Sequence, residues 1–203
     1  MSSPRPPLPR VDAYLAGLPA GFASHPGCLA KGAVVRNAFD DVPGLDALAV
    51  ALPPELAQLV QEPPLAGEWI PEVQFVALVH AIADVLGLDD AAAAARNRAR
   101  SRTLFDSPTY RILMAVFSPA ALVRFSGKRW SNFHRGSTLE VSGASDDGVR
   151  FVLDFPTALF DLRALGMFAQ AFAAALELSG GRSPDVLIEE AGPTRCRYRA
   201  IWG

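Results

Sequence analysis

The stretch that decides the fold runs from residue 138 to residue 202 and contains two kinds of pattern. Apolar and polar residues alternate in TLEVS at 138–142, VRFVLDF at 149–155, DVLIEE at 185–190 and RCRYRAIW at 195–202. Alternation with a period of two is typical of half-buried β-strands. Residues 159–178 instead repeat their apolar side chains with the period of a helix. The order strand, strand, helix, strand, strand (ββαββ) predicts a four-stranded antiparallel sheet with the helix packed on its inner face.

The residues before Gly136 have helical rather than alternating patterns. We predict helices over 28–39, 55–61, 71–86, 89–100, 108–117 and 119–135. Residues 1–10 hold four prolines and predict a flexible, partly extended tail. The sequence therefore predicts one α+β domain over 11–203, with a helical part at 11–135 and a sheet part at 136–203.

The composition is that of a globular protein. Half of the 203 residues are hydrophobic, which excludes an intrinsically disordered chain. Two cysteines, Cys28 and Cys196, are too few for a disulfide framework, so we expect a reduced, cytoplasmic setting. We find no secretory signal in the first residues and no apolar run long enough to span a membrane.

The net charge of −2 hides a segregation along the chain. Residues 37–95 hold ten acidic residues and no Lys or Arg, whereas 96–135 hold nine basic residues and one acidic residue. A nucleic-acid-binding domain is expected to be basic, and the pI of about 5.9 argues against that class. We expect the opposite charges to pair inside the fold or between subunits.

The last third of the chain resembles a known domain. A helix with small residues precedes Glu189-Glu190, a glycine turn at Gly192, Arg195-Cys196-Arg197-Tyr198 and Trp202. This resembles the end of the 4-vinyl-reductase domain, which belongs to the ligand-binding fold of nitric-oxide sensors, phenol-sensing regulators and Golgi transport (TRAPP) subunits. Over its whole length the chain is similar to an uncharacterised myxobacterial family of about 200 residues, through segments such as 69–71 and 133–137.

The resemblance implies cofactors whose ligands this sequence lacks. In the phenol-sensing relatives a glutamate and several cysteines hold zinc. Here Cys196 and Glu190 match two of those ligands, but Ala191 and Gly192 stand where a further cysteine is needed. The haem-binding relatives use a proximal histidine and a Tyr-x-Ser-x-Arg motif, which is missing. We therefore predict no zinc and no haem, and no other metal or cofactor.

Six large aromatic or amphipathic residues on otherwise apolar faces are the candidate lining of a pocket for a small hydrophobic ligand. They are Trp69, Phe75, His80, Tyr110, Trp130 and His134. In the predicted 119–135 helix, Trp130 and His134 are four residues apart and share a face. The alternative is that the same residues are ordinary core, with His134 bonded to a backbone carbonyl.

Three functions stay open at this stage. The first is a non-catalytic sensory or scaffold module that binds a small hydrophobic molecule or a protein partner and forms a homodimer. The second is a purely structural interaction subunit without a ligand pocket. The third is an unrecognised enzyme, for example one that pairs His134 with Asp106, although no catalytic motif is present. We expect neither nucleic acid nor membrane as a partner.

Overall fold

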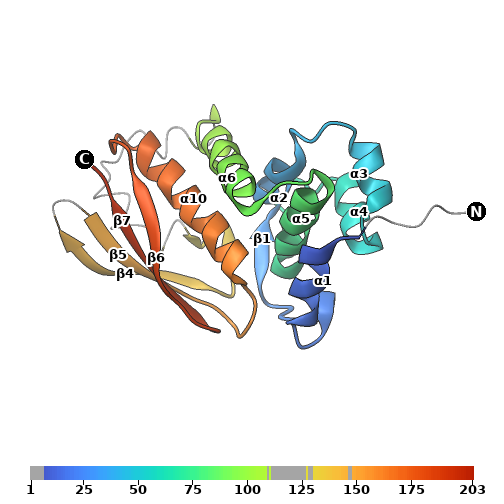
Figure 1. Cartoon of the computed structure of the whole chain (residues 1–203), viewed down its shortest axis with the longest axis horizontal. Helices are drawn as coiled ribbons and strands as arrows, with labels where there is room; N and C mark the ends of the chain where they lie inside the picture. Colours follow the sequence, from blue (N-terminus) through green and yellow to red (C-terminus); the bar gives the residue numbers. More distant parts are fainter. Residues whose placement is uncertain (1–6, 109, 111–126, 128–129, 146–147) are drawn as a thin grey trace, which may run out of the picture. The chain divides into compact units, whose positions relative to one another are not determined.

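The computed structural model describes residues 7–108, 110, 127, 130–145 and 148–203. Its chain divides into two compact units, Met1–Ala93 and Ala94–Gly203, here called the first and the second unit. We expected the helical part to give way to the sheet part at Gly136. The boundary between the two units lies instead inside a helix, more than forty residues earlier. The α+β class predicted from the sequence is confirmed (Figure 1).

The first unit is built around one central helix, α5 (Glu72–Val85). Ten of its fourteen residues are buried, so this helix is apolar nearly all round, as expected when neighbours surround a helix. The elements that contact α5 are the strands β1 (Leu29–Lys31) and β2 (Trp69–Pro71), the 3-10 turn η1 (Gly21–Ala23) and four helices: α1 (Pro9–Ala16), α2 (Gly32–Phe39), α3 (Leu45–Ala51) and α4 (Pro54–Gln61).

Two short strands of the first unit differ from the prediction. β1 (Leu29–Lys31) pairs antiparallel with β2 (Trp69–Pro71), and each immediately precedes a helix. The helices predicted at 28–39 and 71–86 therefore begin later than expected, by four residues at Gly32 and by one residue at Glu72. Three residues are too few to show alternation, so these strands were assigned to the helices that follow them.

The proline-rich start of the chain is partly helical. α1 begins at Pro9, inside the segment that its prolines suggested was a tail, and Leu8 is buried. Proline is well tolerated in the first turn of a helix because its missing N–H has no helical partner there. Residues 1–6 lie outside the described part of the chain.

The second unit contains the predicted four-stranded antiparallel sheet. Its strands are β4 (Thr138–Ser145), β5 (Gly148–Asp154), β6 (Asp185–Ala191) and β7 (Arg195–Ile201), in the order β4-β5-β7-β6. Both outer strands carry an irregularity in their pairing, between Val141 and Gly143 in β4 and between Ile188 and Glu190 in β6. The ββαββ prediction from the sequence is confirmed, with strand ends within three residues of those observed.

The helix α10 (Leu162–Leu178) covers the inner face of this sheet and contacts β6 and β7 (Figure 1). The Asp161 carboxylate accepts a hydrogen bond from the Ala164 N–H at 2.8 Å, which caps the helix. Beneath α10, Cys196, Tyr198 and Ala200 of β7 are fully buried. The buried Tyr198 hydroxyl donates to the Leu165 carbonyl at 3.1 Å and ties the strand to the helix.

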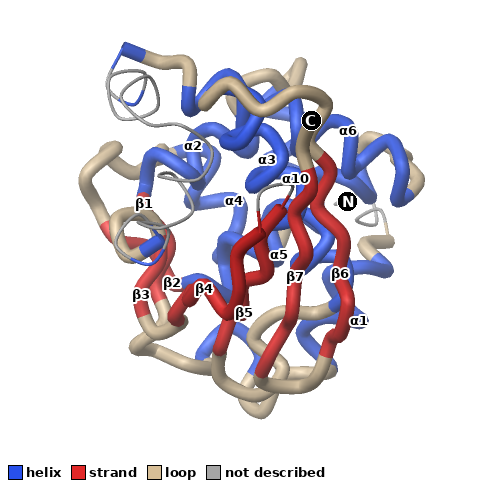
Figure 2. Tube along the Cα trace, turned by 90° about the vertical axis from the view of Figure 1, so that its left-hand side faces the viewer, coloured by secondary structure: helices blue, strands red, loops and turns tan. Residues whose placement is uncertain are grey.

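Figure 2 shows the four strands side by side in the order β4-β5-β7-β6. The outer face of this sheet carries charged residues, as predicted for the alternate positions of β7. Arg195 donates to Asp154 at 2.6 Å and Arg197 to Glu190 at 2.7 Å. Arg150 of β5 reaches Glu189 of β6 at 3.0 Å. These pairs join neighbouring parts of one face, so much of the charge of the second unit is paired within that unit.

The predicted helix at 119–135 does not extend to its expected end. Residues 131–133 form a turn, and β3 (His134–Arg135) is a short strand. The predicted helix at 108–117 and most of the one at 119–135 lie outside the described residues. Among the helices that the structure describes, none has the length and hydrophobicity of a membrane span.

The charge segregation seen in the sequence follows the division into units. The first unit holds 4 Lys and Arg against 11 Asp and Glu, whereas the second holds 15 against 10. The helix α6 (Asp90–Phe105) contains the point where the sign changes. The two units are therefore oppositely charged parts of one chain.

Candidate functional site

The six predicted pocket residues are divided between the two units, and we describe each unit by itself. Trp69, Phe75 and His80 belong to the first unit, and Tyr110, Trp130 and His134 to the second. Within the units the structure brings two of them into direct contact, Trp130 and His134. A pocket lined by all six stays a prediction.

Trp130 and His134 form the centre of the candidate site. Their rings are stacked, with centroids 4.0 Å apart and planes inclined by 18°. Both rings meet Phe168 of α10 edge-on, at 5.1 Å and 5.4 Å between centroids. Their contact was expected from a spacing of one helical turn, but His134 lies in a strand, so the turn at 131–133 brings the rings together instead.

The polar edge of Trp130 is satisfied inside the second unit. Its indole N–H donates to the Ser137 hydroxyl at 2.9 Å, and both side chains are buried. A buried indole N–H without a partner would cost about 1–3 kcal/mol, so this bond fixes the orientation of the ring. Ser137 was missed from the sequence, because a turn and a strand separate it from Trp130 and no periodicity connects them.

The stacked pair is part of a continuous aromatic cluster. Phe172 of α10 contacts both Trp130 and Phe151, and Phe151 stacks on Tyr198 with centroids 5.2 Å apart. At the other end, Phe168 contacts Phe160, which contacts Phe155. We call these eight residues the aromatic cluster: Trp130, His134, Phe151, Phe155, Phe160, Phe168, Phe172 and Tyr198.

The electrostatics of the cluster favour neutral groups. Burial raises the pKa of Tyr198 well above the ordinary value, and the adjacent Cys196 raises it further. Burial also raises the pKa of the Cys196 thiol. Both groups therefore stay protonated at neutral pH, and the cluster suits an apolar or aromatic guest better than an ion.

Tyr110 lies beside the second unit's Phe133, outside the cluster as defined. Their centroids are 5.1 Å apart, and Phe133 also contacts Phe105 edge-on. Burial raises the pKa of Tyr110. Because Phe133 follows Trp130 by three residues, Tyr110 is connected to the candidate site through the turn at 131–133.

The candidate residues of the first unit have different surroundings. Phe75 and His80 are buried on α5, and His80 meets Tyr14 of α1 edge-on at 5.5 Å. Trp69 is half-buried on β2, and the Lys31 ammonium lies 4.3 Å from the centre of its ring. These residues are accounted for by packing of the first unit and by a cation–π contact.

The comparisons with known proteins bear on the fold. No family model matches the sequence, and no curated protein matches it. Solved structures do match: the iron(II), unliganded H-NOX protein from K. algicida superposes with a TM-score of 0.61 at 10% identity, covering 85% of this chain and 96% of that one. The fold resembles that of H-NOX domains.

Other matches have the same character. An oxygen-binding H-NOX domain related to soluble guanylate cyclases has a TM-score of 0.59 at 11% identity, over 84% of this chain and 92% of its own. A mutant of the T. Tengcongensis H-NOX has a TM-score of 0.56 at 12% identity, over 84% and 94%. The expected likeness to nitric-oxide-sensing proteins therefore holds for the fold. The myxobacterial family and the 4-vinyl-reductase and transport-subunit resemblances find no support among these matches.

Several of the matching H-NOX structures are described by their haem, so the fit of this chain to haem can be tested. None of the three tyrosines, at 14, 110 and 198, begins a Tyr-x-Ser-x-Arg motif. Of the three histidines, His80 and His134 are buried against aromatic rings, and each has further interactions. Within the described residues, these two buried histidines are occupied by ring contacts, which does not fit the axial ligand of a haem.

The zinc ligands suggested by the resemblance are equally incomplete. Cys196 is buried beneath α10, whereas Glu190 is on the outer face and pairs with Arg197. In the described part of the chain, no three His, Cys, Asp or Glu residues come close enough to hold a metal ion. The geometry of this segment is explained by strand packing and cross-strand pairing.

Proposed function

We propose that this chain is a non-catalytic sensory or scaffold module with an H-NOX-like fold that functions without haem. The observation that carries the proposal is the aromatic cluster of the second unit, centred on the stacked Trp130 and His134. Seven of its eight residues are Trp, Phe or Tyr, and hydrogen bonds orient the Trp130 N–H and the Tyr198 hydroxyl. Such a lining is typical of sites for small hydrophobic molecules.

The ligand class follows from the chemistry of the cluster. Edge-to-face and stacked contacts between rings add about 0.5–1.5 kcal/mol each beyond the burial of area. A planar hydrophobic ligand that enters the cluster would replace some contacts between its rings by contacts between the rings and the ligand. We therefore propose a small, uncharged aromatic or aliphatic ligand, with Trp130 and His134 as its principal contacts.

Native mass spectrometry of the purified chain, followed by thermal unfolding with toluene as the probe, tests this proposal. A ligand that binds only the folded state raises the Tm, by an amount that grows with its concentration. Phe172→Trp adds bulk inside the cluster and should abolish the shift, whereas Leu187→Trp on the outer face is the matched control. Absence of a co-purified molecule together with an unchanged Tm in toluene would contradict ligand binding.

The haem-free part of the proposal has a separate readout. Titration with haemin should give no Soret band of a coordinated haem, and His134→Gln should not change that spectrum. A coordinated spectrum that is lost in His134→Gln or His80→Gln would overturn it. Measurement of toluene binding by the same variants distinguishes loss of the hydrophobic ligand from loss of haem coordination.

A second function is favoured by a specific observation, the completeness of the packing. The Trp130 N–H and the Tyr198 hydroxyl both have partners within the second unit. A core that satisfies its own polar groups suits an interaction subunit without a pocket. In that case toluene has no effect, and light scattering shows a dimer or a complex at micromolar concentration.

Catalysis is the least favoured function. His134 is buried and stacked on Trp130, whereas Asp106, its suggested partner, is exposed. A general base must reach the substrate proton, and a histidine held between rings is poorly placed for that role. This contrast supports a binding rather than a chemical role.

A further inference from the structure

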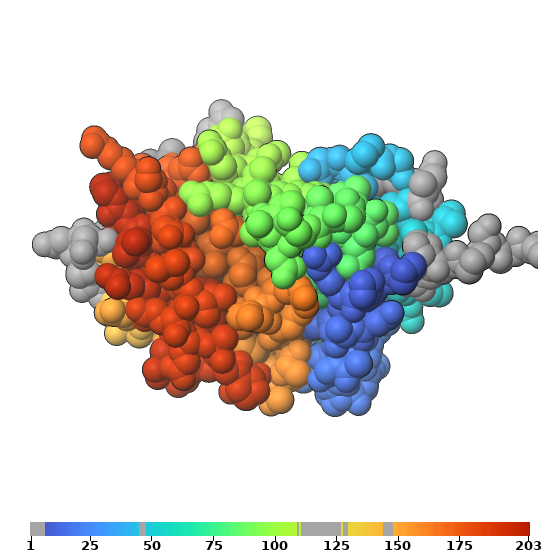
Figure 3. All heavy atoms as spheres, viewed as in Figure 1, coloured from blue at the N-terminus to red at the C-terminus, as the bar shows by residue number. Residues whose placement is uncertain are grey.

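The helix α6 begins in the first unit and continues into the second, and it is held by polar contacts. Residues 90–93 belong to the first unit and residues 94–105 to the second. None of its sixteen residues is buried, and its atoms lie on the visible surface in Figure 3. A helix without buried side chains gains little from hydrophobic packing, so its polar contacts decide whether it stays in place.

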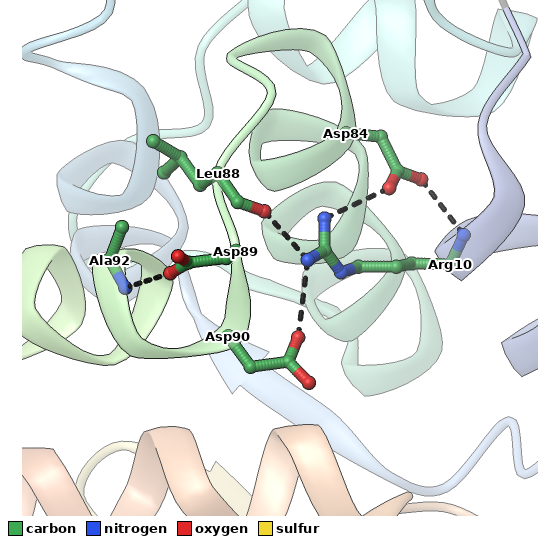
Figure 4. Close-up of polar contacts among 6 residues, drawn as sticks. All are labelled: Arg10, Asp84, Leu88, Asp89, Asp90 and Ala92. Atoms are coloured by element: carbon green, nitrogen blue, oxygen red, sulfur yellow. Dashed lines mark hydrogen bonds and ion pairs between the residues drawn. The ribbon is translucent and has the colours of Figure 1, made fainter.

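The start of α6 is fixed by Arg10 (Figure 4). The Arg10 guanidinium donates to the Leu88 carbonyl at 2.6 Å and to Asp90 at 3.1 Å. Arg10 is itself held by Asp84 of α5, which accepts from its backbone N–H at 2.9 Å and from its side chain at 3.1 Å. Only 3% of the Asp84 side chain is exposed, so the Arg10–Asp84 pair is shielded from salt, whereas the Asp90 side chain is 67% exposed.

In the second unit, two ion pairs of α6 share one carboxylate. Glu177, in the last turn of α10, pairs with Arg102 at 2.9 Å and with Arg98 at 3.6 Å. Arg98 also donates to the Pro184 carbonyl at 3.1 Å. The side chains of Glu177 and Arg98 are each 32% exposed and that of Arg102 is 52% exposed, so solvent and salt reach both pairs.

We propose that Glu177 is the release point of α6: loss or screening of this carboxylate frees residues 94–105 while Arg10 keeps the first turn fixed. Exposed ion pairs contribute little individually and are weakened by salt. Removal of Glu177 breaks both pairs at once. It also leaves Arg98 and Arg102 one helical turn apart, where like charges repel. The inference does not depend on the proposed ligand.

Amide hydrogen exchange of the full chain, measured by mass spectrometry, tests the release point. A freed helix of this length is marginal in water and frays, so its amides exchange faster. In Glu177→Gln we expect several-fold faster exchange in residues 94–105 and unchanged exchange in residues 84–92. Glu189→Gln is the matched control, because Glu189 is also a 32% exposed carboxylate paired with an arginine.

Unchanged protection of residues 94–105 in Glu177→Gln would overturn the proposal, as would equal loss in Glu189→Gln. A second measurement does not depend on that variant. Raising NaCl from about 0.05 M to about 1 M shortens the Debye length to about 3 Å. The wild-type chain should then exchange in residues 94–105 like Glu177→Gln, and the variant should respond much less. A salt-independent wild type would also overturn the proposal.

The two arginines provide the complementary test. Arg98→Gln combined with Arg102→Gln should also accelerate exchange in residues 94–105, and adding Glu177→Gln should change it little further, because both pairs that Glu177 makes are already gone. Additive effects would show that Glu177 and the arginines act independently and would contradict a single release point.

Discussion

The two units use ion pairs in opposite ways. In the first unit Arg10 and Asp84 are 3.1 Å apart, with 17% and 3% of their side chains exposed. In the second unit Arg195 and Asp154 are closer, at 2.6 Å, but 56% and 36% exposed. Solvent screens the second pair, and removal of one partner leaves no buried charge there. The comparison teaches that burial, rather than distance, decides what an ion pair contributes.

The largest effect is expected from Asp84→Ala. The substitution removes the nearly buried carboxylate to which the Arg10 backbone N–H and guanidinium donate, whereas Asp90 and the Leu88 carbonyl remain as partners of the guanidinium. Loss of two hydrogen bonds to a charged group should cost about 3 kcal/mol of unfolding free energy. Urea denaturation followed by circular dichroism measures the loss. A loss no greater than that of Asp154→Ala would break the comparison between the units.

Trp130→Phe tests whether the second unit also depends on a buried polar contact. It removes the N–H that Ser137 accepts and part of the ring volume, and we expect a loss of about 1–3 kcal/mol. Trp130→Phe combined with Ser137→Ala should cost less than the two single variants together, because both partners are then gone. Strict additivity in denaturant melts would show that the hydrogen bond contributes nothing.

The stability of both units should fall at the alkaline end of the pH range. Burial raises the pKa of Cys196 above its ordinary 9.0 and that of Tyr198 well above 10.0. Because the unfolded chain loses these protons first, the stability they provide is complete below about pH 9 and falls as pH rises. The limit is about 1.4 kcal/mol per pH unit for each group.

Cys196→Ala isolates one of these contributions. Between about pH 8.5 and 11, the slope of the unfolding free energy against pH should be smaller in the variant than in the wild type. In the first unit, burial and the charge of Glu72 raise the pKa of Cys28 in the same direction. Cys28→Ala should therefore reduce the slope too, and equal slopes in all three proteins would contradict the assignment.

The smallest effect is expected from Asp154→Ala. Its pair with Arg195 is exposed on the outer face of the sheet, so the loss should be about 0–1 kcal/mol and should vanish at high salt. Denaturant melts at low and high NaCl measure both quantities. A loss above about 2 kcal/mol would show that the outer face is less accessible to solvent than its exposure indicates.

The sheet of the second unit was predictable because its signal is local. Each strand alternates over at least five residues, and glycine-rich or serine-rich turns separate the segments. The strands β1 and β2 were not, since three residues cannot establish a period. The helix α3 was not predicted either. Arg10 shows what local patterns cannot predict, because its partner Asp84 is 74 residues away in the sequence.

The candidate site was predictable only in part. Trp130 and His134 are in contact as expected, although through a turn rather than along a helix. The helical period of residues 159–178 also predicts that Phe168 and Phe172 share one face, because they are four residues apart. It does not identify the strand residues that they contact. Residue types and spacing identify which side chains are candidates, whereas their partners depend on the tertiary packing of distant segments.

The irregular pairing of β4 and β6 has a consequence for assembly in the cell. The exposed edge of a sheet is a template on which a strand of another chain can add, and continuous edges promote aggregation. Here both edges are interrupted, between Val141 and Gly143 on one side and between Ile188 and Glu190 on the other. A foreign strand could follow neither edge over its full length. Interrupted edges of this kind disfavour strand addition, so the edges of this sheet are poor templates for it.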